Sequence, residues 1–264
     1  KKEQVMKRRE FLAASAFAAT GVSALAQESK RDRLYYEWIR YNVTTNADRG
    51  NLEAYWENAA IPAFNRLGIR PIGVFRPKFG AHGLDLYVLI PHPTLESFAT
   101  AWDRIAKDAA YQAAGAEFLD APLNDPLYYR FETSLLHAFT HLPMLEIPEH
   151  IQGKGSRFYE VRIYESHSRE KAKLKTEMFN EGGEIDLFKK TGLNPVMFGE
   201  TLAGEKMPNL VYILGFESME EHGKAWDTFR NSEGWANMKD LPRYKDTVSS
   251  VTDIILSPAG CSQM

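Results

Sequence analysis

Residues 158–164 read Phe-Tyr-Glu-Val-Arg-Ile-Tyr, and residues 35–41 read Tyr-Tyr-Glu-Trp-Ile-Arg-Tyr. Both stretches are rich in aromatic and β-branched side chains, which predicts two β-strands, at residues 157–166 and 34–43. The pair Tyr36-Glu37 in the first stretch of the chain matches Tyr159-Glu160 in the second. A spacing of about 124 residues between like motifs indicates an internal repeat.

Three further landmarks recur in the same order and at nearly the same spacing. They are a turn that ends in proline, an Ala-Trp-Asp triplet and a later aromatic residue, found at 68–71 and 192–195, 101–103 and 225–227, and Tyr111 and Trp235. Chance is a poor explanation for matches that keep both order and offset. The chain therefore holds two copies of one module.

Each copy predicts the element order strand, helix, strand, strand, helix, strand. The first helix of copy one carries an apolar face interrupted by Pro62, and Gly182-Gly183 interrupts the corresponding helix of copy two. Ser218 begins a capping box that opens the second helix of copy two. The remaining strands are expected at 72–76, 84–90 and 129–136 in copy one, and at 196–201, 210–216 and 247–256 in copy two.

This element order is the ferredoxin-like arrangement, in which four antiparallel strands carry both helices on one face. The bare face of one sheet needs a cover, and the second copy can supply it. We therefore predict an α+β fold of two tandem ferredoxin-like modules, residues 34–137 and 157–257, whose antiparallel sheets close as a dimeric α/β-barrel-type pseudo-dimer. The segment 138–156 is rich in Pro, Gly and His and is interpreted as a linker.

Residues 7–12, Lys-Arg-Arg-Glu-Phe-Leu, look like a twin-arginine export motif. A short apolar run over 13–25 and the Ala-Leu-Ala at 24–26 complete the pattern of a cleaved signal peptide. We assign residues 1–26 to a twin-arginine signal peptide and expect a periplasmic or otherwise exported protein. The alternative is a buried N-terminal helix. The run is too short for a stable membrane span, so no membrane association is expected of the mature form.

The 264 residues include 32 basic and 35 acidic side chains, a formal net charge of -3. This balance gives no field for gathering nucleic acid, so no nucleic-acid partner is expected. The one cysteine, Cys261, cannot form an internal disulfide. A P-loop, a Rossmann glycine set, a nucleophile elbow and a zinc cysteine set are absent, so no cofactor is predicted. Composition leaves a homo-oligomer open.

The strand at 158–164 is similar to the opening Y-E-x-R-x-Y strand of the NIPSNAP family. The Trp226 helix followed by Trp235 also resembles that family, and the resemblance extends over both copies, roughly residues 34–258. Copy one departs from the pattern, because Ile39 stands where copy two has Arg162. The resemblance implies a barrel of the dimeric α/β type, whose relatives include cofactor-free monooxygenases and haem-degrading enzymes. It implies the fold more firmly than an activity.

Strand alternation puts Val161 and Ile163 on one face and Glu160, Arg162 and Tyr164 on the other. We expect the apolar pair to meet the helices and the polar set to look into the barrel between the modules. A carboxylate, a guanidinium and a phenol there could bind a small acid or polarise a carbonyl. The alternative is an internal ion pair that joins the two modules.

The candidate ligand-binding residues combine this set with its copy-one counterparts and with the tyrosines of the third strands. They are Glu160, Arg162, Tyr164, Glu37, Tyr41, Tyr87 and Tyr212. No catalytic residue is assigned. Trp102 and Trp226 recur at helical spacing and are interpreted as core.

Three histidines suggest metal or haem chemistry at first sight. His137 and His141 have a zinc-ligand spacing, but they straddle a strand end and the linker, so they are interpreted as two unrelated linker histidines and no metal site is predicted. His222 replaces Phe98 on the apolar face of the repeat. We interpret His222 as a core histidine, with an axial haem ligand as the alternative.

These features predict an exported protein that binds a small organic ligand between its two barrel modules. One alternative is a cofactor-free monooxygenase or isomerase-like enzyme, in which Arg162 and Glu160 steady an enolate or oxyanion. The other is a structural or assembly protein without a pocket. A polar cavity in the barrel would favour a ligand or an enzyme, and an interior filled with side chains would favour the structural role.

Overall fold

The structure is a computed structural model that describes residues 33–79 and 83–264. The predicted twin-arginine motif and the cleavage site after Ala26 lie outside these residues. Within the described ranges, no helix is both long enough and apolar enough to cross a membrane.

The first half, residues 33–138, follows the predicted order of elements. Its strands are β1 (Tyr35–Asn42), β2 (Gly73–Phe79), β3 (Leu86–His92) and β4 (Arg130–Ala138). Its helices are α1 (Asn46–Tyr55), η1 (Trp56–Ala60), α2 (Ile61–Arg66), α3 (Leu95–Ile105) and α4 (Ala109–Leu119).

The second half, residues 157–264, repeats that order. Its strands are β5 (Phe158–Glu165), β6 (Pro195–Ala203), β7 (Asn209–Phe216) and β8 (Ser250–Pro258). Its helices are α5 (Arg169–Phe179), α6 (Glu184–Thr191), α7 (Met219–Arg230), α8 (Glu233–Lys239) and the short η3 (Pro242–Tyr244).

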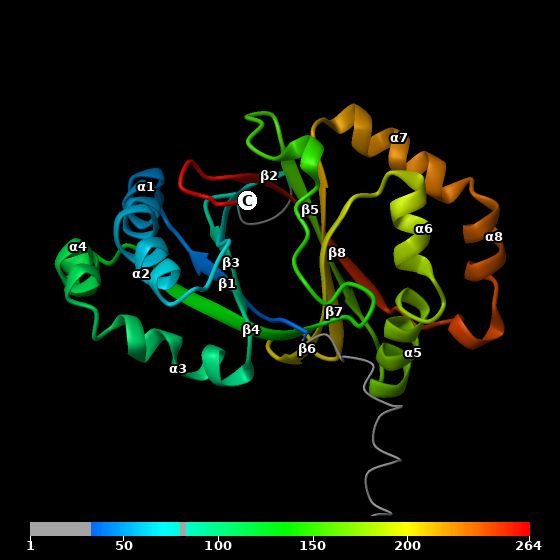
Figure 1. Cartoon of the computed structure of the whole chain (residues 1–264), viewed down its shortest axis with the longest axis horizontal. Helices are drawn as coiled ribbons and strands as arrows, with labels where there is room; N and C mark the ends of the chain where they lie inside the picture. The colour runs from blue at the N-terminus through cyan, green and yellow to red at the C-terminus, as the bar shows by residue number, and fades with distance from the viewer. Residues whose placement is uncertain (1–32, 80–82) are drawn as a thin grey trace, which may run out of the picture. The chain divides into compact units, whose positions relative to one another are not determined.

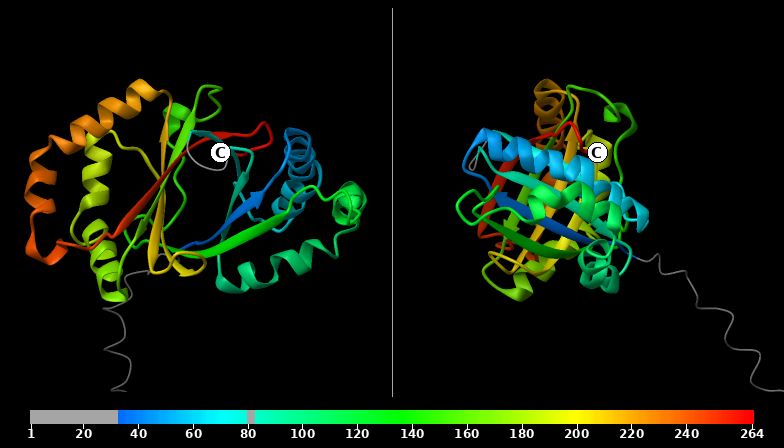
Figure 2. Two further views of the ribbon diagram at one scale, coloured as in Figure 1. Left: turned by 180° about the vertical axis from the view of Figure 1, so that it is seen from behind. Right: turned by 90° about the vertical axis from the view of Figure 1, so that its left-hand side faces the viewer.

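The strands form one closed antiparallel barrel in the order β1-β3-β2-β8-β5-β7-β6-β4. Each half contributes four neighbouring strands, and the halves meet where β2 pairs with β8 and β4 pairs with β6. Closure removes the free sheet edges that would otherwise invite pairing with other chains. The helices of the two halves lie on opposite sides of the strands (Figures 1 and 2), so the antiparallel α+β architecture is as predicted.

The first helix departs from regular α-helix geometry in both halves. In the first half a π-helical segment, η1, joins α1 to α2 and directly precedes the turn that contains Pro62. In the second half α5 ends at Phe179 and α6 begins after Gly183, whose φ of 81° is the left-handed conformation that glycine adopts without strain. The interruption predicted from Gly182-Gly183 is therefore confirmed. At Pro62 the chain stays helical, and only the hydrogen-bond pattern changes from α to π just before the proline.

The connector between the halves, predicted as a linker, is partly built into the fold. Phe139, Leu142 and Ile151 are buried. The backbone N–H of Phe139 donates to Phe198 of β6, and that of Glu146 donates to Val196 on the same strand. A segment anchored in this way fixes how the halves are joined instead of merely spanning the distance between them.

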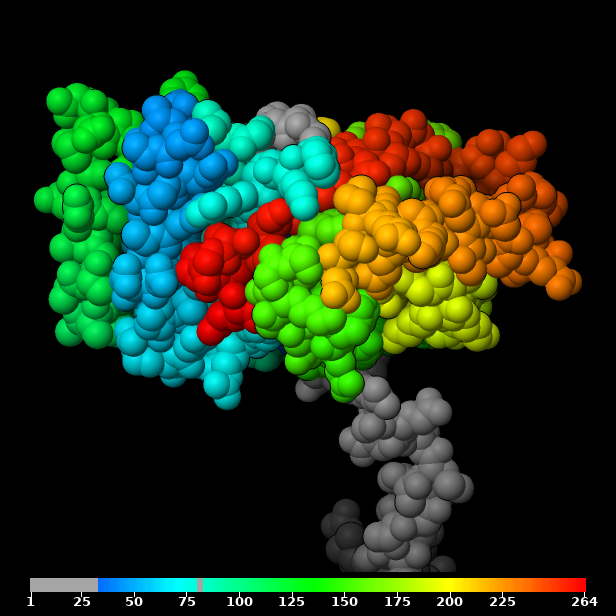
Figure 3. Space-filling model, turned by 90° about the horizontal axis from the view of Figure 1, so that it is seen from above, coloured from blue at the N-terminus to red at the C-terminus, as the bar shows by residue number. Residues whose placement is uncertain are grey.

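The last residues of the chain run along β2. The backbone N–H of Gln263 donates to Ile72, and the Ser262 hydroxyl accepts from the backbone N–H of Val74. Figure 3 shows these residues, in red, lying beside the first-half segment in cyan. The second half therefore contacts the first half beyond the two strand seams.

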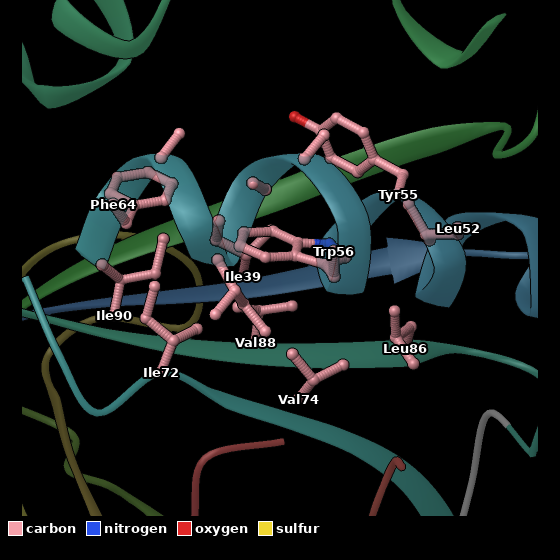
Figure 4. Packing of buried hydrophobic residues seen from close by; sticks show 14 of the residues in the cluster. Ile39, Leu52, Tyr55, Trp56, Phe64, Ile72, Val74, Leu86, Val88 and Ile90 are labelled. Carbon is pink, nitrogen blue, oxygen red and sulfur yellow. The ribbon is translucent and has the colours of Figure 1, made fainter. Parts of the chain in front are cut away.

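Apolar side chains fill three separate spaces. One lies between the first-half helices and the sheet, where Trp56 of η1 points onto the strands (Figure 4). A second lies between the second-half helices and the sheet, and a third lies inside the barrel. The barrel interior is occupied by side chains from both halves, among them Tyr36, Leu89, Tyr159 and Ile213. It is therefore mainly a packed core.

Candidate functional site

Glu160, Arg162 and Tyr164 lie on the helix-facing side of β5. Val161 is buried in the barrel interior and Ile163 packs against the same cluster, whereas Glu160 hydrogen-bonds to α7 and Tyr164 packs in the helix-side core. The predicted orientation was therefore wrong. Alternation separates the two faces of a strand, but both faces of a closed and covered barrel wall are buried, so the pattern does not say which face is interior.

Glu160 is a fully buried carboxylate surrounded by donors. The indole Nε1 of Trp226 donates to its Oε2 at 2.8 Å, and Nε of Arg162 donates to its Oε1 at 2.8 Å. His222 Nε2 lies 3.3 Å from Oε2. Burial opposes the charged form, but His222, Arg162 and Trp226 outweigh it and lower the pKa of Glu160. Glu160 is thus held as a carboxylate at neutral pH.

The Arg162 guanidinium is held from several sides. Its Nη2 lies 2.8 Å from Glu160 Oε1 and 3.2 Å from Asp253 Oδ2, and its Cζ sits 4.0 Å from the centre of the Trp226 ring. Nη1 makes no hydrogen bond with any residue that the structure describes. Burial and the charge of Glu160 raise the pKa of Asp253 to about 6, although Arg162 opposes this rise.

The first half holds the same kind of cluster around Glu37. The indole Nε1 of Trp102 donates to both carboxylate oxygens, at 3.1 and 3.2 Å. His92 Nε2 lies 3.3 Å from Oε2, and the Thr133 hydroxyl donates to Oε1 at 3.4 Å. Each half therefore packs a glutamate, a tryptophan and a histidine beneath its helices.

The two histidines reach their glutamates from different elements. His92 ends β3 and packs against Phe98 of α3, with ring centroids 5.7 Å apart. His222 lies on α7 and packs against Phe216, which ends β7, at 4.9 Å. Histidine and phenylalanine have thus exchanged positions between the halves, and the space beside the carboxylate holds an imidazole in both.

A cavity of about 550 Å³ lies between the helices of the second half and strands β5 and β8. Its aromatic lining consists of Tyr164, Phe188, Trp226, Phe229, Trp235 and Tyr244. Its charged lining consists of Arg162, Lys175, Arg230, Lys239 and Lys245, with Glu184 and Asp246. Its volume is in the range of small-molecule sites, and hydrogen-bond donors outnumber acceptors among its charged groups.

A pair of tyrosines fixes one donor on the cavity wall. The Tyr212 hydroxyl donates to the Tyr164 hydroxyl oxygen at 2.9 Å. Burial raises the pKa of Tyr212 well above its ordinary value, so Tyr212 keeps its proton. Tyr164 lines the cavity, and its own hydroxyl proton has no acceptor among the described residues.

Lys175 and Glu184 form a buried ion pair on the same wall. Nζ of Lys175 lies 2.7 Å from Oε2 of Glu184 and 4.3 Å from the centre of the Phe179 ring. Burial raises the pKa of Glu184, and Lys175 acts in the opposite direction. Sequence reasoning missed this pair. The available signal was a lysine in register with the buried Met178 and Phe179 of α5.

Next to β1, the corresponding space in the first half is filled by side chains. A cavity of about 280 Å³ lies between α1 and α4, but no strand residue lines it. Ile39 occupies the β1 position that matches Arg162, and Trp56 is fully buried with its ring 6.3 Å from Tyr41. Tyr41 and Glu37, both predicted to bind a ligand, are therefore buried on the helix side of the first half. They do not lie with the second-half residues.

Tyr87 is the predicted residue that does lie inside the barrel. Its ring stacks on Trp38 with centroids 5.3 Å apart. Both rings line a cavity of about 310 Å³ that residues of both halves share, among them Arg40 and Asp253. Burial raises the pKa of Tyr87 to about 12. Tyr212, which was grouped with Tyr87 in the prediction, lies on the helix side.

His137 and His141 have different surroundings. Nδ1 of His137 lies 2.9 Å from Nη2 of Arg33, and its ring stacks on Tyr35 at 4.5 Å. The backbone N–H of His141 donates to Asn180 at 3.0 Å. In the part of the chain that the structure describes, no group of three or more His, Cys, Asp or Glu residues could hold a metal ion.

A closed antiparallel barrel with helices on its outer wall defines an α+β protein of the dimeric α/β-barrel class. The NIPSNAP family model matches residues 36–121 and 159–263, which together make up most of the chain. The chain belongs to the NIPSNAP family. A search of curated proteins gave no match.

Several solved structures share the fold. A candidate monooxygenase from Lactobacillus acidophilus NCFM matches 86% of this chain and 94% of its own, at 11% identity and a TM-score of 0.55. A second candidate monooxygenase, from Fusobacterium nucleatum, matches 86% and 93%, at 8% identity and a TM-score of 0.54. An anthrone oxidase-like protein matches 87% and 93%, at 10% identity and a TM-score of 0.51. Likeness at these identities shows the fold alone.

Proposed function

We propose that this protein binds a small organic anion in the cavity of its second half, with Arg162 as the anchoring residue. The observation that carries the proposal is the guanidinium itself. Glu160, Asp253 and the Trp226 ring hold it on the wall of a 550 Å³ cavity while Nη1 makes no hydrogen bond within the described residues. The sequence led us to expect the ligand between the halves, and the proposal moves it beneath α5–α8.

An arginine suits this task because it stays charged at any working pH and offers donors in a fixed plane. Glu160 and Trp226 limit the freedom of the side chain, so a carboxylate that meets Nη1 finds a donor that is already oriented. Asp253 competes for the same guanidinium, which makes the attraction depend on the charge of Asp253. The indole and phenyl rings that line the cavity favour a ligand with a flat apolar body.

A barrel interior filled with side chains was expected to favour a structural protein without a pocket. Side chains do fill most of the interior. That argument concerns the interior alone, because the second-half cavity lies on the helix side of the wall. The monooxygenase and anthrone oxidase-like names of the similar structures point to oxygenation of the ligand as another candidate function. Ligand binding is nevertheless the proposal, because likeness at these identities carries the fold and not the chemistry.

The experiment compares Arg162→Met with Arg66→Met, a matched substitution of an exposed arginine that pairs with Asp108 at 2.6 Å in the first half. Native mass spectrometry of each purified protein, followed by extraction, identifies any co-purified acid. We expect the wild type and Arg66→Met to carry the same organic acid and Arg162→Met to lose it while remaining folded. Retention of the acid by Arg162→Met would contradict the proposal.

A further inference from the structure

We infer that the ligand carries a second oxygen function, an uncharged hydrogen-bond acceptor that the Tyr212–Tyr164 pair recognises. The inference rests on the proposed function and narrows the ligand to a class: an aromatic carboxylate that also bears a carbonyl or ether oxygen.

The direction of the tyrosine hydrogen bond is the first step. Tyr212 is fully buried, and its hydroxyl donates to the oxygen of Tyr164 at 2.9 Å. Tyr164 uses its oxygen to accept this bond, so its own proton must point elsewhere. In the described part of the chain no group accepts that proton. The side chain lines the cavity, which leaves a bound molecule or water as the acceptor.

The second step is that the donor is held in place. The Tyr164 ring packs edge-on against Tyr212, with centroids 5.2 Å apart, and tilted against Phe179 at 6.2 Å. Lys175 Nζ lies 5.7 Å from the centre of the Tyr164 ring, but it is a cation paired with Glu184 and cannot accept a hydrogen bond. Tyr164 therefore offers a neutral donor with little freedom to move.

The third step is the spacing of the two donors. Arg162 and Tyr164 are two residues apart on the same face of β5, so their backbones are about 6.6 Å apart along the strand. One donor is charged and the other is neutral. A rigid ligand with a carboxylate at one end and an acceptor oxygen at the other can satisfy both. A ligand without the second oxygen leaves the Tyr164 donor unpaired in a partly dry site, which weakens binding.

The experiment uses two probe acids of the same charge and closely similar shape, 4-acetylbenzoate and 4-isopropylbenzoate. The first has a ketone oxygen where the second has a methyl group. Isothermal titration calorimetry gives the ratio of their affinities for the wild type, Tyr164→Phe and Tyr212→Phe. Tyr111→Phe is the matched control, because the Tyr111 hydroxyl also belongs to a tyrosine pair, 2.7 Å from that of Tyr55, but lies in the first half and outside the cavity. Arg162→Met tests whether Arg162 anchors the carboxylate of the two probe acids.

We expect the wild type and Tyr111→Phe to bind 4-acetylbenzoate about tenfold more tightly than 4-isopropylbenzoate. The ratio should fall to about one in Tyr164→Phe. It should take an intermediate value in Tyr212→Phe, where the ring of Tyr164 is intact but its hydroxyl can turn. A wild-type ratio near one, or a ratio that Tyr164→Phe leaves unchanged, overturns the inference.

The two proposals fail in different ways. If both acids bind and Arg162→Met abolishes their binding, the proposed function stands whatever the ratio is. If neither acid binds, or if Arg162→Met binds both as well as the wild type does, the proposed function is overturned and the inference falls with it.

Discussion

Arg162 is the residue that distinguishes the two buried carboxylates of this protein. Glu37 and Glu160 both accept from a tryptophan indole and both lie 3.3 Å from a histidine nitrogen. Beside Glu37 the strand carries Ile39, and the space above it is packed. Beside Glu160 it carries Arg162, and the space above it is a cavity. The half with the charged side chain is therefore the half we assign to binding.

The pH dependence of binding follows from Asp253, whose pKa is raised to about 6 by burial and by Glu160. Above this pH the Asp253 carboxylate competes with the ligand for Arg162, and below it the competition is removed. Lowering the pH from 7.5 to 5.5 should therefore tighten binding of 4-isopropylbenzoate by about threefold to tenfold, as calorimetry at the two pH values would show.

Asp253→Asn is the control for this effect, because it removes the titrating charge and keeps the shape. Its affinity should be high at both pH values and nearly independent of pH. Binding to the wild type that weakens as the pH falls would show that Asp253 does not compete for Arg162.

The sequence predicted part of the cluster of polar residues in the second half. Alternation along β5 correctly grouped Glu160, Arg162 and Tyr164 on one face. Alternation did not say which face of β5 meets the helices. The polar set was predicted to face away from the helices, but the helices supply its hydrogen-bond donors. The helical spacing of Trp226 predicted a core residue. Its indole N–H also donates to Glu160, and this hydrogen bond helps to make the burial of that carboxylate possible.

At the scale of elements, the repeat shows what each half requires beneath its helices. The imidazole comes from the end of β3 in one half and from α7 in the other, and a phenylalanine occupies the vacated position each time. A histidine on an apolar helix face looked like a simple core residue. Only the packing of α7 on β5 and β7 reveals that it sits beside Glu160.

The exchange of histidine and phenylalanine between the halves predicts that a second substitution can compensate for the loss of His222. His222→Phe should lower the free energy of unfolding by about 1–3 kcal/mol, because a buried carboxylate loses a polar neighbour. Adding Phe216→His recreates the first-half arrangement and should recover at least half of that loss. Urea unfolding of both single variants and the double variant measures the coupling. Strictly additive losses in the double variant would contradict the idea that either route satisfies Glu160.

At the scale of the whole molecule, the repeat and the order of its elements were sufficient to predict an antiparallel α+β barrel. We infer that the halves are tandem ferredoxin-like modules, because each contributes four neighbouring strands in the same relative order. The cavity was not predictable in the same way. It depends on how α5–α8 pack, and side-chain volumes such as Trp56 in the first half decide whether the corresponding space is filled.

The central claim is that the ligand lies beneath the second-half helices and not between the halves. A crystal soaked in 4-bromobenzoate tests this most directly, because anomalous scattering from bromine locates the probe. We predict a bromine peak in the cavity bounded by Trp226 and Trp235, with the carboxylate on Arg162. A peak at the shared barrel cavity beside Trp38 and Tyr87, with none beneath α5–α8, would contradict the account.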